Sequence, residues 1–184
     1  MTADPPTPRL ELVRGMQVES FAALYGAHHD FVRRTVRGLG VPEHAADEVT
    51  QDVFIIVHRR LPGFDHRAPV KAWVFGIARN LARKYRERQG RARPQLQLVH
   101  GGAPARPDDA LQWREAAVVV ERFLAALDED KRAVFVLAEL EGMTAPEVAE
   151  TIGVNLNTVY SRLRTARALF AKAVARAEAR RQRR

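Results

Sequence analysis

The sequence contains no cysteine, and this absence excludes disulfide bridges, thiol nucleophiles and zinc sites built on cysteine. It also lacks any apolar run near the roughly 18 to 20 residues that span a bilayer, so we expect no membrane insertion. The first six residues have neither a basic flank nor an apolar core, which argues against a secretory signal. Because 46% of the 184 residues are apolar, the chain can build a core. We therefore expect a globular protein of the cytoplasm.

The motifs of common enzymes are missing as well. The chain has no phosphate-binding glycine loop ending in Lys-Ser/Thr and no Gly-x-Ser-x-Gly turn. A metal cluster can be imagined from His28, His29 and Asp30 together with Asp65 and His66. However, adjacent histidines on a helix point in different directions, and no His-Glu-x-x-His spacing is present. We expect no catalytic residue, no cofactor and no metal, and an enzyme is the least favoured of the alternatives.

Charge of one sign is in excess. Lysine and arginine number 30 against 22 aspartates and glutamates, which gives a formal net charge of +8. Such an excess favours a polyanionic partner such as nucleic acid. The charge is uneven along the chain, since the segment 43–52 is acidic whereas the segment 71–88 and the stretch after Ser161 are basic.

Apolar residues recur at helical spacings of three and four, and no useful length of chain alternates with a period of two. The predicted fold is therefore all-α, with two small helical domains joined by a flexible linker. Helices are expected from Phe21 to the glycines at 38 and 40, and over 42–61, 70–88, 113–127 and 128–142, followed by two more. The predicted division is a flexible leader 1–17, a domain 18–88, a linker 89–110, a domain 111–175 and a basic tail 176–184.

The sharpest local pattern lies in residues 144–163. Thr144 and Glu147 form a capping box, Gly153 permits a left-handed turn, and Asn155 can cap the following helix. This combination predicts a helix-turn-helix, with a plain pair of packed helices as the alternative. The polar side chains expected on or near the outer face of its second helix are Asn157, Thr158, Tyr160, Ser161, Arg162, Arg164 and Thr165.

Two helices of the first domain carry opposite charge. In the acidic helix, Asp47, Gln51 and Asp52 share one side with Phe54 nearby, which indicates either a protein-docking face or an ordinary solvated one. The basic helix interleaves Trp73 and Tyr85 with cations, a combination that binds phosphates and stacks on exposed bases. The alternative is that both rings belong to the core, and we expect this of part of each ring.

The chain resembles the extracytoplasmic-function (ECF) class of bacterial RNA polymerase sigma factors from about Phe21 to Leu169. The resemblance is carried by 46–54 (ADEVTQDVF), by Phe64 and Asp65 with 71–83 (KAWVFGIARNLAR), and by 127–144 and 158–167 (TVYSRLRTAR). In this family the first domain contains region 2 and the second contains region 4, which reads the −35 element.

The resemblance implies that the chain is a promoter-specificity factor that binds core RNA polymerase and promoter DNA and starts transcription. It implies that the acidic helix docks on the polymerase clamp through Asp47, Glu48, Gln51, Asp52 and Phe54. It implies that the −10 strand is held by Phe64, Asp65, Lys71, Trp73, Arg79, Asn80 and Arg83. The outer face of the helix-turn-helix would contact the −35 duplex, the linker would thread the RNA channel, and an anti-sigma factor is an expected partner.

Some positions depart from the family's pattern. His58 stands where the family often has tryptophan, and Ala145 where an aromatic residue is frequent. Asn155, Asn157 and Tyr160 replace the common proline, glycine and lysine, which concerns the promoter sequence that is read. The alternative function is a helix-turn-helix repressor or activator that acts without polymerase, but it leaves the acidic helix and the segment from Trp73 to Asn80 unexplained.

Overall fold

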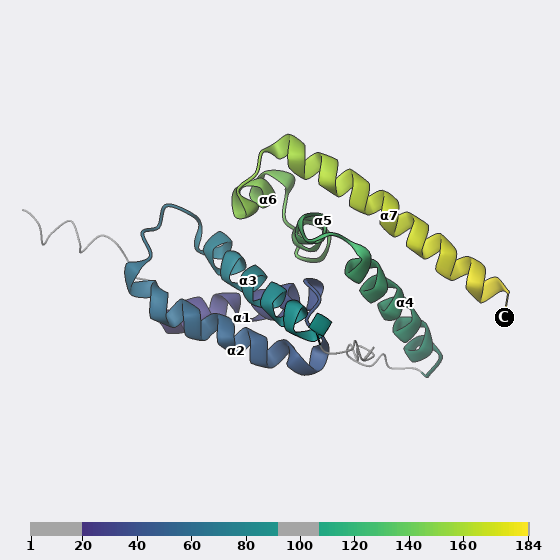
Figure 1. Ribbon diagram of the computed structural model, residues 1–184, viewed down its shortest axis with the longest axis horizontal. Coiled ribbons are helices and arrows are strands. Elements are labelled where there is room, and N and C mark those ends of the chain that lie inside the picture. Colours follow the sequence, from purple (N-terminus) through teal and green to yellow (C-terminus); the bar gives the residue numbers. More distant parts are fainter. Residues whose placement is uncertain (1–19, 92–106, 184) are drawn as a thin grey trace, which may run out of the picture.

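The computed structural model describes residues 20–91 and 107–183, and within these ranges the chain forms helices and no strands (Figure 1). The expected all-α class is confirmed. No helix in these ranges is long and apolar enough to cross a membrane. The predicted leader 1–17, most of the predicted linker 89–110 and Arg184 lie outside the described residues. The elements are α1 (Phe21–Gly38), α2 (Glu43–Arg60), η1 (Leu61–Gly63), α3 (Val70–Arg91), α4 (Pro107–Ala126), α5 (Glu129–Phe135), η2 (Val136–Leu140), α6 (Ala145–Ile152) and α7 (Leu156–Gln182).

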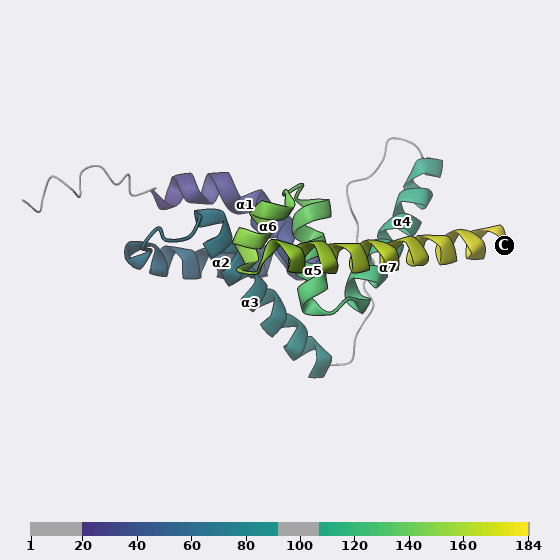
Figure 2. The same ribbon diagram turned by 90° about the horizontal axis from the view of Figure 1, so that it is seen from above.

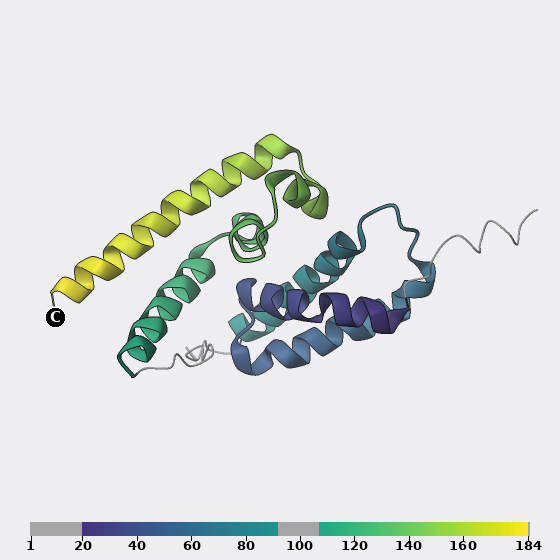
Figure 3. The ribbon, with the colours of Figure 1, turned by 180° about the vertical axis from the view of Figure 1, so that it is seen from behind.

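Helices α1, α2 and α3 pack pairwise against one another and form what we call the first module. Figure 3 shows α1 lying across α2 and α3. Helix α1 begins where the Ser20 side chain accepts a hydrogen bond from the amide of Ala23 (3.2 Å). Apolar side chains at helical spacing line the interior of this bundle, including Leu24, Val32, Val36, Val53, Val57, Val74 and Phe75.

Helices α4 to α7 form the second module, in which α7 packs against α4, α5 and α6. The predicted caps are confirmed: the Asp128 carboxylate accepts from the amide of Lys131 (2.9 Å), and the Asn155 side chain accepts from the amide of Thr158 (2.8 Å). The capping box of Thr144 is also present. Gly153 has φ +70°, the left-handed conformation expected of the turn between α6 and α7. The helix-turn-helix therefore forms as predicted.

Some element boundaries differ from the expectation. The single helix expected over 128–142 is instead α5 followed by the π-helical turn η2, in which the amide of Glu141 reaches back five residues to the carbonyl of Val136 (3.0 Å). Helix α3 continues to Arg91, and α4 begins at Pro107. Both helices thus extend into the segment that composition had indicated as linker. Helix α4 can begin at Pro107 because proline is well tolerated in the first turn of a helix.

The two modules pack directly against each other (Figures 1 and 2). Helix α6 lies on α3, and η2 lies on α1. One continuous core joins them, because Val134, Leu137 and Val148 of the second module cluster with the buried residues of the first. A second cluster around Phe123 and Phe135 holds α4, α5 and α7 together.

Arg132 of α5 is buried at the junction of the modules, with 4% of its surface exposed. Its guanidinium donates to the carbonyls of Leu124 (2.6 Å), Ala125 (3.1 Å) and Leu127 (2.8 Å) at the end of α4. A fourth hydrogen bond, 3.3 Å long, reaches the carbonyl of Leu39, which follows α1 in the first module. A single side chain thus satisfies backbone groups from both modules, as buried carbonyls require.

Replacing Arg132 with methionine should lower the free energy of unfolding by about 2–4 kcal/mol, because the substitution removes the donors of buried carbonyl oxygens. Chemical denaturation followed by circular dichroism measures this change. Arg122→Met is the matched control, since Arg122 is exposed on α4. Equal unfolding midpoints for the two variants would contradict the structural role of Arg132.

Candidate nucleic-acid and polymerase interfaces

The acidic surface of α2 is open to solvent over most of its length. Glu48, Gln51 and Asp52 are exposed on it. Asp47 is also exposed, but its carboxylate accepts a hydrogen bond from Arg33 Nε of α1 (2.7 Å). The hydrogen bonds to Asp47 and then to Glu43 raise the pKa of Arg33, so this guanidinium holds α1 and α2 together as a permanent cation.

The structure places Phe54 differently from the other four residues expected to dock on polymerase. Phe54 is only 3% exposed, because its ring packs against Phe21 and Tyr25 with centroid distances of 6.4 and 4.6 Å. It therefore supports the surface from beneath. The exposed apolar groups beside the acidic residues are Tyr25 and Ile55 (40% and 47% exposed), which the sequence had not singled out.

A hollow of about 530 Å³ lies where α2 passes through η1 into the loop before α3. Within it, the rings of Phe64 and Trp73 stack with centroids 4.5 Å apart and an interplanar angle of 23°. The Asp65 carboxylate accepts from the amide of Arg67 (3.2 Å) and fixes the turn. The side chains of Arg59, Arg60 and Arg67 line the same hollow, although sequence reasoning did not select them. An aromatic stack surrounded by cations is suited to an unstacked base and its phosphates.

The remaining −10 candidates face several sides of α3. Asn80 and Arg83 are exposed, and Arg83 lies 3.9 Å from Glu87 one turn along its own helix. Lys71 turns toward α1, with its ammonium 4.7 Å from the centroid of the Phe31 ring. Arg79 turns toward the second module, where acidic side chains bind it. The structure therefore brings Phe64, Asp65 and Trp73 together and distributes the other four along the helix.

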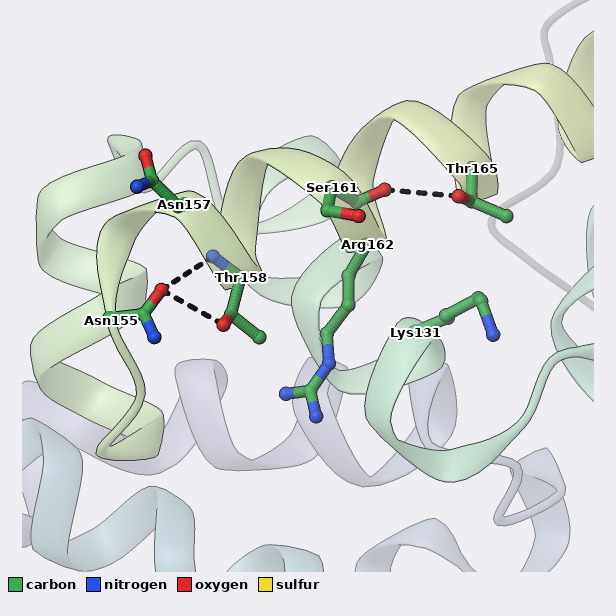
Figure 4. Close-up of a pocket in the computed structure, with 7 residues that line it drawn as sticks. All are labelled: Lys131, Asn155, Asn157, Thr158, Ser161, Arg162 and Thr165. Carbon is green, nitrogen blue, oxygen red and sulfur yellow. Dashed lines mark hydrogen bonds between the residues drawn. The ribbon is translucent and has the colours of Figure 1, made fainter.

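The first turns of α7 present a polar face above α5 (Figure 4). Asn157, Tyr160, Ser161, Arg164 and Thr165 are exposed, and 54% of the surface of Tyr160 is open to solvent. A hollow of about 610 Å³ on this face also includes Lys131 of α5, a residue that the sequence did not select. Polar side chains at the N-terminal end of an exposed second helix are the arrangement that reads base edges in the major groove.

Three of the predicted DNA-reading side chains have internal partners. Thr165 Oγ1 donates to the carbonyl of Ser161 (3.0 Å), one turn back on the same helix. Thr158 Oγ1 donates to Asn155 Oδ1 (2.9 Å), so this hydroxyl takes part in capping α7. Arg162 points away from Ser161 in Figure 4, and its guanidinium donates to Asp130 of α5 (2.5 Å). Within the described ranges, no group of three His, Asp or Glu side chains is placed to hold a metal ion.

Comparison with known proteins identifies both modules. The family model Sigma-70 region 2 matches residues 24–92, and the model Sigma-70, region 4 matches residues 117–170. The chain is 32% identical over 159 residues to the RNA polymerase sigma factor CnrH of Cupriavidus metallidurans, covering 81% of this chain and 83% of CnrH. It is 30% identical over 153 residues to the ECF RNA polymerase sigma factor SigM of Mycobacterium tuberculosis, covering 83% of this chain and 76% of SigM.

Solved structures show the same architecture. The structure of CnrH in complex with the cytosolic domain of CnrY aligns with a TM-score of 0.64 and 28% identity, over 90% of this chain and 93% of CnrH. The sigma factor RpoE of Bartonella quintana, crystallised with the anti-sigma factor NepR, aligns with a TM-score of 0.67 and 19% identity over 85% of this chain and 98% of RpoE, and shares the fold.

A region 2 bundle followed by a region 4 helix-turn-helix defines the class of promoter-specificity factors that bind core RNA polymerase and promoter DNA. Within that class, the chain belongs to the extracytoplasmic-function sigma factors. The region 2 match accounts for the acidic helix and the segment 73–80, which a repressor or activator acting without polymerase had left unexplained.

Arg164→Ala should weaken binding to duplex DNA that the wild-type chain selects from a random library. A plot of log affinity against log salt concentration should have a slope that is shallower by about one unit, because one exposed cation no longer displaces a counterion. Titrations at several salt concentrations measure both quantities. Arg167→Ala is the control, since the Arg167 guanidinium is already bound to Glu139 at 2.7 Å. An equal loss in both variants would contradict a special role for Arg164.

Proposed function

We propose that the hollow at the end of α2 is the site that captures an unstacked base of the −10 strand. The observation that carries this proposal is the Phe64–Trp73 stack enclosed by Arg59, Arg60 and Arg67. Taking a base out of the duplex costs a few kcal/mol. Stacking on an aromatic ring returns about 1–3 kcal/mol per base, and the arginines supply the attraction to the flanking phosphates. Binding free energy alone can therefore hold the strand open.

We further propose that α2 docks on core polymerase through Asp47, Glu48, Gln51 and Asp52, with Tyr25 and Ile55 as apolar contacts at the edge. Exposed carboxylates beside two large exposed apolar side chains form a surface that is suited to a basic partner helix. The −35 duplex would lie on Asn157, Tyr160, Ser161, Arg164 and Thr165 of α7. The protein would act in the cytoplasm without enzymatic activity of its own.

An inhibitory protein of the anti-sigma class is the further partner that we propose. The solved structure of CnrH holds the cytosolic domain of CnrY, and that CnrH chain aligns with this one over 90% of its length. Such an inhibitor would compete with polymerase or DNA for the exposed faces of α2, α3 and α7.

Reconstituted transcription tests the proposed function as a whole. Core RNA polymerase alone should not start from a genomic template library at defined sites, whereas polymerase with the chain should start at a limited set of sites. Mapping the 5′ ends of the transcripts gives the answer. If a saturating amount of the chain produced no new start site, the proposal would fail.

Asp52→Lys should lower the affinity for core polymerase by at least about tenfold, because it places a cation where the docking surface is acidic. Duplex binding by α7 should be unchanged. Fluorescence anisotropy of the labelled chain measures the polymerase affinity. Glu115→Lys, the same charge reversal at an exposed position of α4, serves as the control and should keep wild-type affinity. Retention of that affinity by Asp52→Lys would exclude α2 as the docking surface.

Trp73→Ala should leave polymerase binding intact and reduce promoter opening by about tenfold, because a base loses its stacking surface. Permanganate reactivity of unpaired thymines reports opening. Tyr85→Ala removes another half-buried aromatic ring of the same helix and controls for lost packing. Similar opening defects in both variants would point to the stability of α3 rather than to stacking.

A further inference from the structure

The cations of α3 that face the second module are already bound by carboxylates. Arg79 donates from Nε to Glu129 (3.1 Å) and from Nη2 to Asp130 (2.7 Å). Arg86, two turns along the same helix, lies 3.6 Å from the other oxygen of Glu129. Both acids occupy the first turn of α5, so one short acidic segment of the second module covers the part of α3 that carries Arg79 and Arg86.

The same segment also reaches the recognition helix. Asp130 accepts from Arg79 with one carboxylate oxygen and from Arg162 of α7 with the other. One carboxylate therefore joins an arginine expected to contact the −10 strand with one expected to contact the −35 duplex. A charge-assisted pair of this kind presents oxygen acceptors to the guanidinium as a phosphate group does.

Other contacts hold the modules in this arrangement. Arg34 of α1 forms two hydrogen bonds with Glu141 (3.0 and 2.8 Å), and Arg132 donates to the carbonyl of Leu39. The end of α1 fits closely against η2, because a Cβ added to Gly38 would lie 2.9 Å from both γ-carbons of Val136. The modules thus meet through ion pairs and through a backbone approach that only glycine permits.

We propose that Glu129 and Asp130 act as an internal substitute for DNA phosphates and keep the free chain closed until polymerase or DNA separates the modules. This inference rests on the proposed role of α3 in holding the −10 strand. A phosphate that binds Arg79 must displace the Asp130 carboxylate, since the same N–H groups serve both. The apparent affinity of the free chain for single-stranded DNA is therefore reduced by the fraction of molecules that are open.

Neutralising Glu129 and Asp130 tests directly whether their carboxylates take the place of DNA phosphates. Glu129→Gln with Asp130→Asn keeps the side-chain shapes and removes the charges that bind Arg79 and Arg86. The affinity of the polymerase-free chain for a single-stranded oligonucleotide should rise about tenfold. Glu115→Gln with Glu150→Gln removes the same number of charges from exposed positions of the second module on α4 and α6, and it controls for the general change in net charge. An equal gain in both double variants would overturn the proposal.

A second variant opens the modules without changing any charge. Gly38→Ala places a methyl group against Val136, whereas Gly26→Ala adds the same group on the same helix at a position where, beyond the local helix backbone, nothing lies within 4 Å. We expect Gly38→Ala to bind single-stranded DNA at least about threefold more tightly than Gly26→Ala. Thermal unfolding of both variants shows that they are folded. Identical affinities would contradict the proposal that closure masks the DNA-binding cations of α3.

Measuring the distance between the modules distinguishes the proposed closure from the proposed −10 role of α3. Because the chain has no cysteine, Ala27→Cys on α1 and Ala171→Cys on α7 accept a single pair of fluorescent labels at exposed positions. Energy transfer should fall in the acid-neutralised variant and in Gly38→Ala. Unchanged transfer in both would overturn the closure, whatever their DNA affinity. Lower transfer without tighter DNA binding would support the closure and refute the proposed −10 role of α3.

Discussion

The hydrogen bonds of Arg132 are the interaction on which the arrangement of the chain depends. Burial lowers the pKa of Arg132 to about 10, which still leaves the guanidinium charged at neutral pH. Its partners are the carbonyls at the end of α4, where the helix dipole favours a cation, and the carbonyl of Leu39 in the first module. Helix α5 therefore has a fixed place between the modules. Helix α7 packs on α5, so the orientation of the recognition helix follows from the same contacts.

The charged side chains form separate acidic and basic surfaces, which the net charge of +8 does not show. The exposed carboxylates of α2 form one face, and the cations around the Phe64–Trp73 stack form a second. A third set of cations on α3 is neutralised by acids of the second module, and the polar face of α7 lies beyond them. The positive field attracts DNA over a distance of about a Debye length, whereas the local partners determine which arginines are free to meet it.

The features that could be predicted from the sequence are those determined by residues close together along the chain. The caps at Asp128, Thr144 and Asn155 join residues only three positions apart, so their pattern is visible in the chain itself. The burial of Phe54 and the pairing of Arg79 with Asp130, 51 residues away, depend on tertiary packing that helical periodicity does not encode. The arginines of the hollow could have been found, because they flank the loop in which Phe64 was selected. The π-helical turn left no signal that we recognise in the sequence.

Helix α7 is unbroken from Leu156 to Gln182, although the region 4 match ends at residue 170. The last twelve helical residues, 171–182, extend it by about 18 Å at 1.5 Å per residue. Half-buried Ala173 and Ala177 of this extension line a shared hollow with α4, which braces the helix along its side. The DNA-reading turns and the arginine-rich end are thus parts of one rigid rod. A ligand that tilts the far end must turn the reading end with it, so α7 behaves as a lever arm.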